Sequence, residues 1–257
     1  FPIFYLINIL FLFYWMIGFK KQIWANIIIL IFGIQYLGLF LGTQPTTKEN
    51  PDNIKVLSYN VRLFNRNGWI PRSDVKSEIF KFLKKENADI LCIQEFYAPN
   101  EIPNLNYKYE HIGSQNKKGQ PNMAIYSNYE QIEKGTVNIK GERMNNTCIY
   151  SDMIINSETI RVYNVHLASN WFKNSDYSFL ENPQNEKLKK GISGIVERMK
   201  SSYKKRAEEA QAIKKHMQNS PFPIILCGDF NDTPLSYAYN TIISDLNDSF
   251  SESGKGI

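Results

Sequence analysis

The sequence predicts a four-layered α/β sandwich, two packed mixed sheets flanked by helices, preceded by a transmembrane helical hairpin. Two observations support this fold class. From residue 53 to residue 257, short apolar runs bounded by turn residues alternate with amphipathic, charged segments, a pattern that is typical of sheets covered by helices. Before residue 42, the apolar residues instead form two long runs.

The two N-terminal runs have nearly the length of membrane helices. The runs are Ile3–Phe19, with about 17 residues, and Ile23–Leu41, with about 19. As helices they would be roughly 25 and 28 Å long, and the hydrocarbon core of a bilayer is about 30 Å thick. We therefore expect residues 1–41 to be two transmembrane helices and residues 42–52 to be a polar linker. A buried helical hairpin is the alternative interpretation.

The charges near these runs predict an orientation. Lys20 and Lys21 lie between the two runs, and the positive-inside rule places them on the cytoplasmic side. The second helix then delivers the following domain to the opposite side. The expected localisation is the bacterial inner membrane, with an extracytoplasmic catalytic domain.

The domain at residues 53–257 is predicted from strand and helix signals in chain order. An apolar strand at 54–59 is followed by a helix at 73–86, which carries its apolar side chains on one face and would pack beside a sheet. Further strands are predicted at 88–95, 107–112, 123–126, 131–139, 147–155, 159–166 and from residue 224 onward.

Charge and cysteine content exclude few functions. The formal net charge is +5, and three lysines that precede Glu49 account for +3 of it. About +2 therefore remains on the domain, which is far from the strongly basic surface of many nucleic-acid binders. Residues 186–215 carry ten Lys or Arg against four Glu, which suits either a solvated helix face or contact with phosphates. The three cysteines have no zinc-site spacing.

Four of the predicted strands end on polar side chains. Ligands of α/β sheets bind at the carboxyl ends of strands, and carboxylate, amide and imidazole groups are suited to a hard cation or to phosphoryl oxygens. These side chains therefore predict a metal-dependent phosphoester site. They are Asn60, Gln94, Glu95, His166, Asp229 and Asn231.

The same strand ends resemble the motifs of the endonuclease/exonuclease/phosphatase superfamily, which includes deoxyribonucleases, abasic-site endonucleases, inositol-polyphosphate phosphatases and sphingomyelinases. The resemblance covers Ile54 to about Phe250 and implies a membrane-anchored bacterial member with the layered sandwich fold. A Ser-Asp-His motif that carries the family's general-base histidine is absent, so we expect a C-terminally incomplete fragment. The matching segments are Ser58-Tyr59-Asn60-Val61, Gln94-Glu95, Asn164-Val165-His166-Leu167 and Gly228-Asp229-Phe230-Asn231.

This resemblance implies a role for five of the side chains. Glu95 is expected to ligate Mg²⁺, or Mn²⁺ in its place, with help from Asn60, since magnesium prefers hard oxygen ligands. His166 is expected to donate to the scissile phosphate. Asp229 would position or deprotonate the attacking water, and Asn231 would orient that water or bind a phosphate oxygen.

The predicted function is a divalent-metal-dependent phosphoester hydrolase, a phosphodiesterase or phosphatase, tethered to the membrane. Tyr126 and Arg206 are further candidates for substrate binding. The partners would be the lipid bilayer and a lipid or nucleic-acid phosphoester, and no protein partner is inferred. The choice between nuclease and lipid or inositol phosphatase stays open, because one scaffold hosts both. The alternative is a catalytically silent, membrane-anchored phosphate-binding module.

Overall fold

The computed structural model describes residues 1–18, 20–44, 53–97, 104–113, 122–139, 148–170 and 188–256. The chain divides into two compact units, residues 52–242 and residues 1–51 together with 243–257. The sequence predicted a single domain over residues 53–257, whereas residues 243–257 group with the N-terminal segment. From residue 45 onward, the predicted linker lies outside the described residues.

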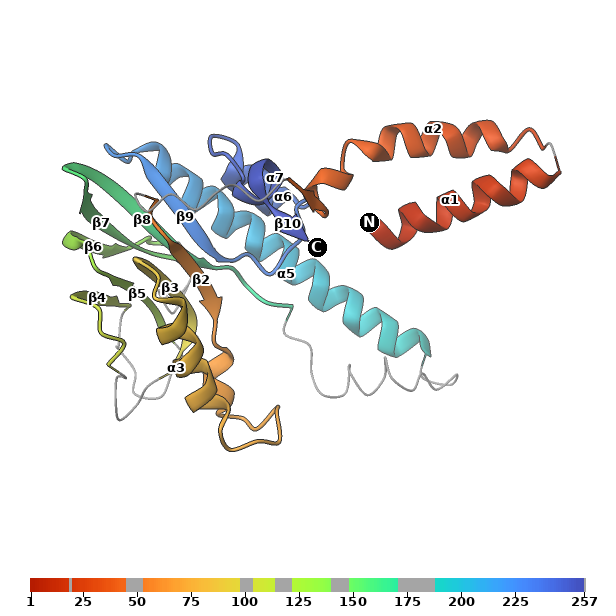
Figure 1. The fold of residues 1–257 in the computed structure, drawn as a ribbon. Helices are drawn as coiled ribbons and strands as arrows, with labels where there is room; N and C mark the ends of the chain where they lie inside the picture. Colours follow the sequence, from red (N-terminus) through yellow and green to blue (C-terminus); the bar gives the residue numbers. More distant parts are fainter. Residues whose placement is uncertain are drawn as a thin grey trace. The chain divides into compact units, whose positions relative to one another are not determined.

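The larger unit contains two four-stranded mixed sheets (Figure 1). In each sheet one parallel pair, β2–β3 or β8–β9, extends an antiparallel set. This confirms the predicted pair of mixed sheets. The first sheet has the order β2 (Val56–Asn60), β3 (Ile90–Phe96), β5 (Asn122–Ser127), β4 (Tyr109–Ile112), and the second β6 (Glu130–Thr136), β7 (Cys148–Ile155), β8 (Glu158–His166), β9 (Ile224–Asp229).

The two faces of β3 pack against different layers, because successive side chains of a strand point to opposite sides. Leu91 and Ile93 belong to one apolar cluster with Leu83 of α3 (Val75–Glu86), whereas Ile90 and Cys92 belong to the core that joins the two sheets. Both faces are therefore covered, which explains why this strand is an unbroken apolar run.

Helix α5 (Leu188–Gln218) covers the second sheet, and it completes the order helix, sheet, sheet, helix (Figure 1). It buries Ala210, Ile213 and Met217, which recur at helical spacing. A hydrogen bond of 2.8 Å between the Tyr163 hydroxyl on β8 and His216 Nδ1 joins the helix to the sheet. The short helices described in this unit are η2 (Arg62–Asn65) and α6 (Tyr237–Ile243). The last residue of α6, Ile243, is assigned to the smaller unit.

The smaller unit begins with the two predicted helices, but these are shorter than expected. α1 (Pro2–Ile17) has 16 residues and α2 (Ile23–Ile34) has 12, so α2 would extend only about 18 Å. Within the described part of the chain, no helix combines the length and the apolar character that crossing a bilayer requires. The predicted transmembrane hairpin is therefore not supported. The remaining elements are η1 (Leu37–Leu39), β1 (Gly42–Thr43), α7 (Ser249–Ser253) and β10 (Lys255–Gly256).

Candidate active site

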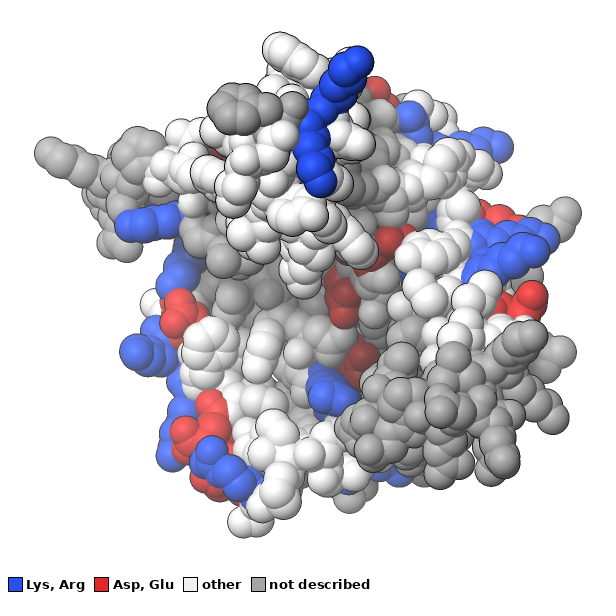
Figure 2. Space-filling model, turned by 90° about the vertical axis from the view of Figure 1, so that its right-hand side faces the viewer, with Lys and Arg blue, Asp and Glu red and all other residues white. Residues whose placement is uncertain are grey.

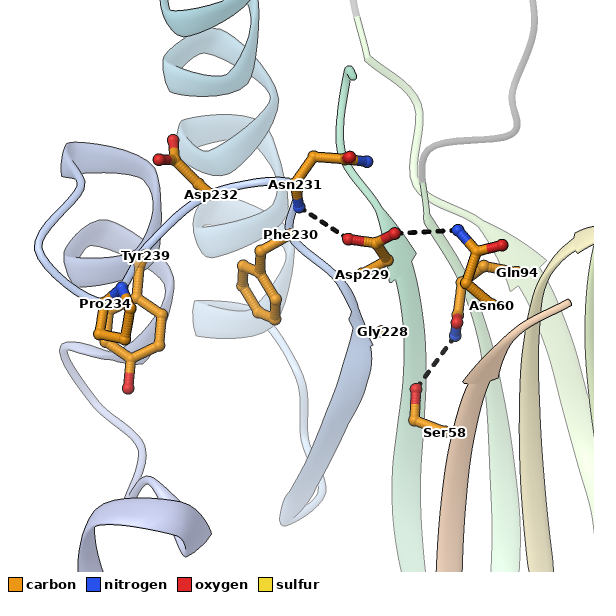
Figure 3. A pocket seen from close by; sticks show the side chains of 10 residues that line it. All are labelled: Ser58, Asn60, Gln94, Gly228, Asp229, Phe230, Asn231, Asp232, Pro234 and Tyr239. Atoms are coloured by element: carbon orange, nitrogen blue, oxygen red, sulfur yellow. Dashed lines mark hydrogen bonds between the residues drawn. The ribbon is translucent and has the colours of Figure 1, made fainter. Parts of the chain in front are cut away.

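One pocket of the larger unit collects polar side chains from the carboxyl ends of strands in both sheets (Figure 3). Its volume of about 470 Å³ is within the range of small-molecule sites. The parallel pairs explain the convergence, since Asn60 lies beside Gln94 in one sheet and His166 beside Asp229 in the other. The pocket is lined by Ser58, Asn60, Gln94, Gly228, Asp229, Phe230, Asn231, Asp232, Pro234 and Tyr239.

The side chain of Asn60 joins the carboxylates of two different sheets. Its Nδ2 donates to Asp229 Oδ2 at 2.9 Å and to Glu95 Oε1 at 3.2 Å. The backbone N–H of Arg62 donates to Asn60 Oδ1 at 2.9 Å and thereby fixes which end of the amide faces the acids. Two negative charges thus share one small region, an arrangement that a bound cation stabilises.

Glu95 reaches this region because the ladder of β3 is irregular. The pairing of β3 with β5 shifts register between Ile93 and Phe96, and Glu95 has the left-handed φ of 51°. A bulge of this kind changes the direction of a side chain. As a result, the neighbouring residue Gln94 is buried, whereas the side chain of Glu95 keeps 27% of its surface exposed.

His166 carries an unsatisfied nitrogen beside Glu95. Within the described residues, its buried Nε2 has no hydrogen-bond partner, and it lies 3.8 Å from Glu95 Oε1. Buried polar atoms are rarely left without a partner, so such an atom beside a carboxylate indicates a group that binds something else. The predicted contact of His166 with a phosphoryl oxygen is compatible with this placement.

Asp229 is held on both carboxylate oxygens. Besides the bond from Asn60, the backbone N–H of Asn231 donates to Asp229 Oδ1 at 2.8 Å. The side chain of Asn231 points away from Asp229 (Figure 3), and its Nδ2 donates to the carbonyl oxygen of Leu167 at 2.9 Å. In this structure Asn231 orients Asp229 through its backbone.

Gly228 allows β9 to lie close to β8 just before Asp229. Its φ is +147°, and a Cβ atom there would lie 2.0 Å from the carbonyl oxygen of Val165. Any side chain would therefore separate the two strands. The glycine of this motif thus sets the distance between the strand ends that carry His166 and Asp229.

The oxygen ligands present fit Mg²⁺ better than a transition metal. Among the described residues, no group of three or more His, Cys, Asp or Glu could hold a metal ion. Mg²⁺ is usually held by one or two carboxylates and keeps several waters. Glu95 and Asp229, which one amide connects, meet that requirement. Glu95 and Asn60 stay the predicted ligands, but Asn60 can bind the ion only through its Oδ1, because its Nδ2 is a donor that faces both acids.

The other two predicted substrate contacts are not among the residues that line the pocket. Tyr126 is 2% exposed, its ring contacts those of Phe96 and Tyr107, and burial raises its pKa. Arg206 is 1% exposed and donates to Asp232 Oδ2 at 2.9 Å and to the carbonyl oxygen of Ala168 at 2.8 Å. Direct substrate binding by either side chain is not supported. Arg206 instead connects α5 to the segments that follow β8 and β9.

Sequence reasoning missed a buried pair of amides beneath the pocket. Gln94 Nε2 donates to Asn164 Oδ1 at 2.7 Å and to Ser58 Oγ at 3.1 Å. Both amides lie in otherwise apolar strands, and a buried amide needs hydrogen-bond partners. An amide within an apolar strand needs a buried partner, and this need was the sign in the sequence from which the pair could have been predicted.

Comparisons with known proteins agree with this geometry. Residues 57–254 match the model of the Endonuclease/Exonuclease/phosphatase family. A search of the curated proteins finds no match. A solved structure of D. rerio TDP2, humanized by 14 mutations, superposes with a TM-score of 0.51 and 14% identity over 76% of this chain and 72% of that one.

Two structures of beta toxin from Staphylococcus aureus are similar to the same degree. A β-hairpin deletion mutant has a TM-score of 0.50 and 16% identity, over 77% of this chain and 74% of that one. A mutant with bound magnesium ions also has a TM-score of 0.50 and 16% identity, over 76% of this chain and 71% of that one. At these identities, the similarity concerns the fold.

Proposed function

We propose that this chain, which belongs to the endonuclease/exonuclease/phosphatase family, is a divalent-metal-dependent phosphoester hydrolase. Members of the superfamily are typically hydrolases of this kind. The observation that carries the proposal is the amide of Asn60, which lines the pocket and contacts both Glu95 and Asp229, so that carboxylates from two sheets meet at one side chain.

The proposed division of labour follows from the hydrogen bonds of each side chain. Asp229, held on both oxygens by Asn60 and Asn231, is oriented to position a water molecule and to accept its proton. His166 has an Nε2 with no protein partner among the described residues and would donate to a non-bridging phosphoryl oxygen. When bound, Mg²⁺ or Mn²⁺ would neutralise charge that develops on the phosphoryl group, with Glu95 and Asn60 as its protein contacts.

The test is hydrolysis of bis-p-nitrophenyl phosphate by the full-length protein, with Mg²⁺ and with a chelator. We expect turnover that requires the metal and that Glu95→Gln removes, with the unfolding transition of the variant intact. A folded protein that turns over neither this ester nor DNA, RNA, inositol phosphates or phospholipids would contradict the proposal. That outcome would favour the catalytically silent phosphate-binding module.

The composition of the pocket wall favours a substrate with an apolar group. Within the described part of the chain, the ten lining residues include Asp229 and Asp232 but no Lys or Arg, and one wall consists of Phe230, Pro234 and Tyr239 (Figure 3). Binding of a polyanion relies on Lys and Arg contacts to its phosphates. We infer that the substrate is a lipid phosphoester, with one phosphoryl group at the carboxylates and an apolar group against the aromatic wall.

We also propose that α1 and α2 contact a lipid bilayer. Their large apolar side chains are widely exposed, among them Phe4 at 71%, Leu10 at 67% and Phe32 at 68%. Figure 2 shows mostly white surface on the hairpin, with blue Lys or Arg atoms among it. Exposed apolar surface of this extent is typical of an interaction site. It supports contact with a membrane, and the bacterial inner membrane, with an extracytoplasmic domain, stays the expected localisation.

Co-sedimentation with phospholipid vesicles tests this second proposal. Replacement of Phe4, Leu10 and Phe32 by serine should release the protein from the vesicles. Phe82→Ser is the matched control, because Phe82 is 41% exposed on α3 in the other unit, and it should leave vesicle binding unchanged. Equal binding by the triple variant and the unaltered protein would exclude the hairpin as the contact.

A further inference from the structure

The bulge of β3 that directs Glu95 toward the pocket is itself held from the opposite sheet. The last regular pair before the register shift is Ile93 with Ala124 of β5, and pairing resumes only at Phe96. The carbonyl oxygens of Ile93 and Ala124 both accept hydrogen bonds from Asn164 Nδ2, each at 2.9 Å. One side-chain amide of β8 thus binds the backbone of both strands at the point where their ladder changes register.

Asn164 uses all of its hydrogen-bonding capacity on this bulge. It is fully buried, its amide group donates both hydrogens to the two carbonyls, and its Oδ1 accepts from Gln94 Nε2 at 2.7 Å. Gln94 immediately precedes Glu95, so the same side chain binds the backbone before the bulge and the side chain within it. Buried, fully satisfied polar networks of this kind specify one local conformation.

We propose that Asn164 is a positioning residue that holds the β3 bulge and thereby keeps the carboxylate of Glu95 at the metal site. Neither Asn164 nor Glu95 lines the pocket, and the effect of Asn164 acts through the bulge that places Glu95 beside Asn60. The inference rests on the proposed function, in which Glu95 ligates Mg²⁺. It adds that the geometry of this ligand is set by β8 of the other sheet, two residues before His166.

The required chemistry explains why an asparagine suits this position. Two carbonyl oxygens of adjacent strands need two hydrogens from one group, and the Gln94 amide needs an acceptor on the same side chain. An aspartate of nearly the same size would supply no donor and would place its oxygens against the two carbonyls. A leucine would leave three buried polar groups without their partner.

Direct Mg²⁺ binding tests the inference without reliance on turnover. Titration calorimetry of the full-length protein with MgCl₂ should show that Asn164→Asp weakens binding by about tenfold or more, the usual effect of losing a partner that orients a metal ligand. Asn164→Ser, which retains one donor and places no charged oxygen against the two carbonyls, should weaken binding by a smaller factor. Circular dichroism and urea unfolding establish that each variant is folded.

Met153→Ala is the matched control for a general loss of stability. Met153 is fully buried in the core between the sheets and pairs with Ile160, six residues before His166, or about 20 Å along β8. Its truncation should lower the unfolding midpoint yet keep the Mg²⁺ dissociation constant within about twofold, because distant sites act independently.

The possible outcomes separate this inference from the proposed function. In one outcome, the unaltered protein binds Mg²⁺ and Glu95→Gln abolishes binding, but the folded Asn164 variants bind Mg²⁺ as tightly as the unaltered protein. This outcome overturns the inference and leaves the proposed function standing. Equal weakening by Met153→Ala and Asn164→Asp would also overturn it. Absence of Mg²⁺ binding by the unaltered protein would overturn both.

Discussion

Asn60 Nδ2 lies 2.9 Å from Asp229 Oδ2, although the two residues belong to different sheets and are 169 positions apart in the sequence. This contact places the end of β2 against the end of β9, so each sheet contributes one side of the pocket. The site therefore depends on how the two sheets pack, and a change in that packing would separate Glu95 from Asp229.

Asp229→Asn should abolish most turnover while the protein still binds substrate. The asparagine keeps the shape and an acceptor for Asn60, but it loses the charge that orients water and accepts a proton. We expect kcat for bis-p-nitrophenyl phosphate to fall by about 10² to 10⁴, with KM nearly unchanged. The midpoint of urea unfolding should change little, because removal of one of two neighbouring negative charges offsets the loss of one of the two hydrogen bonds that Asp229 accepts. A wild-type kcat would remove Asp229 from the mechanism.

Much of the fold could be predicted from local patterns. Strands predicted at 88–95 and 159–166 correspond to β3 (Ile90–Phe96) and β8 (Glu158–His166), because apolar runs and turn residues mark strand ends locally. The helix predicted at 73–86 corresponds to α3 (Val75–Glu86), but the end of α2 was not predicted. The apolar run to Leu41 suggested a single span, whereas α2 ends at Ile34 and η1 follows after two further residues.

The contacts that order the site could not be predicted in the same way. Asn164 and Gln94 are 70 positions apart, and only the packing of two sheets brings them together. Arg206 is a different case, because it lies four and seven positions before the buried residues Ala210 and Ile213. That spacing put it on the buried face of α5, but the surrounding charges directed the interpretation toward solvent.

Arg206→Met should destabilise the larger unit strongly. The change leaves Asp232, whose side chain is 5% exposed, as a buried charge without its ion-pair partner. Loss of one partner of a buried pair costs about 3–5 kcal/mol, which urea unfolding monitored by tryptophan fluorescence can measure. Arg72→Met is the control, because its ion pair with Asp74 is exposed, and the unfolding midpoint should stay constant. An unchanged midpoint for Arg206→Met would show that the pair contributes nothing.

His111 should make the protein less stable in mild acid. Burial, and secondarily the charge of Lys134, lowers the pKa of His111 from its ordinary 6.5, so the unfolded chain binds a proton more readily than the folded one. Its contribution is fully present above pH 6.5 and is lost as the pH falls through the lower pKa of the folded state. His111→Gln should reduce the decline of unfolding free energy below pH 6.5. Part of the decline should remain, because burial also lowers the pKa of His216.

An unchanged pH profile in His111→Gln would contradict this account of His111. The measurement is urea unfolding at a series of pH values at constant ionic strength, so that screening of the Lys134 charge stays constant. The variant loses the contact between His111 Nδ1 and Ser151 Oγ at 3.2 Å, which shifts stability at every pH. The slope against pH, and not the absolute stability, is therefore the quantity to compare.

Tyr239→Ala should weaken binding of apolar substrates selectively. Tyr239 lines the pocket, and its ring lies edge to face with that of Phe230 at a centroid distance of 6.1 Å. If the apolar part of a lipid phosphoester occupies this wall, loss of the ring should raise KM for a short-chain phospholipid by about tenfold, the value of one aromatic contact. KM for an inositol phosphate should change less, because it has no apolar or aromatic group to place against that wall. A nucleotide is not a suitable comparison, because its bases stack on aromatic rings.

Tyr237→Ala gives the matched control for this experiment. Tyr237 lies two positions away on the same helix, is 59% exposed and does not line the pocket. It should leave both KM values unchanged, because the substrate does not reach it. If Tyr239→Ala raised KM equally for phospholipid and inositol phosphate, the aromatic wall would support the pocket without selecting the substrate. The preference for a lipid phosphoester would then lose its structural basis, while the metal-dependent chemistry at Glu95 and Asp229 would be unaffected.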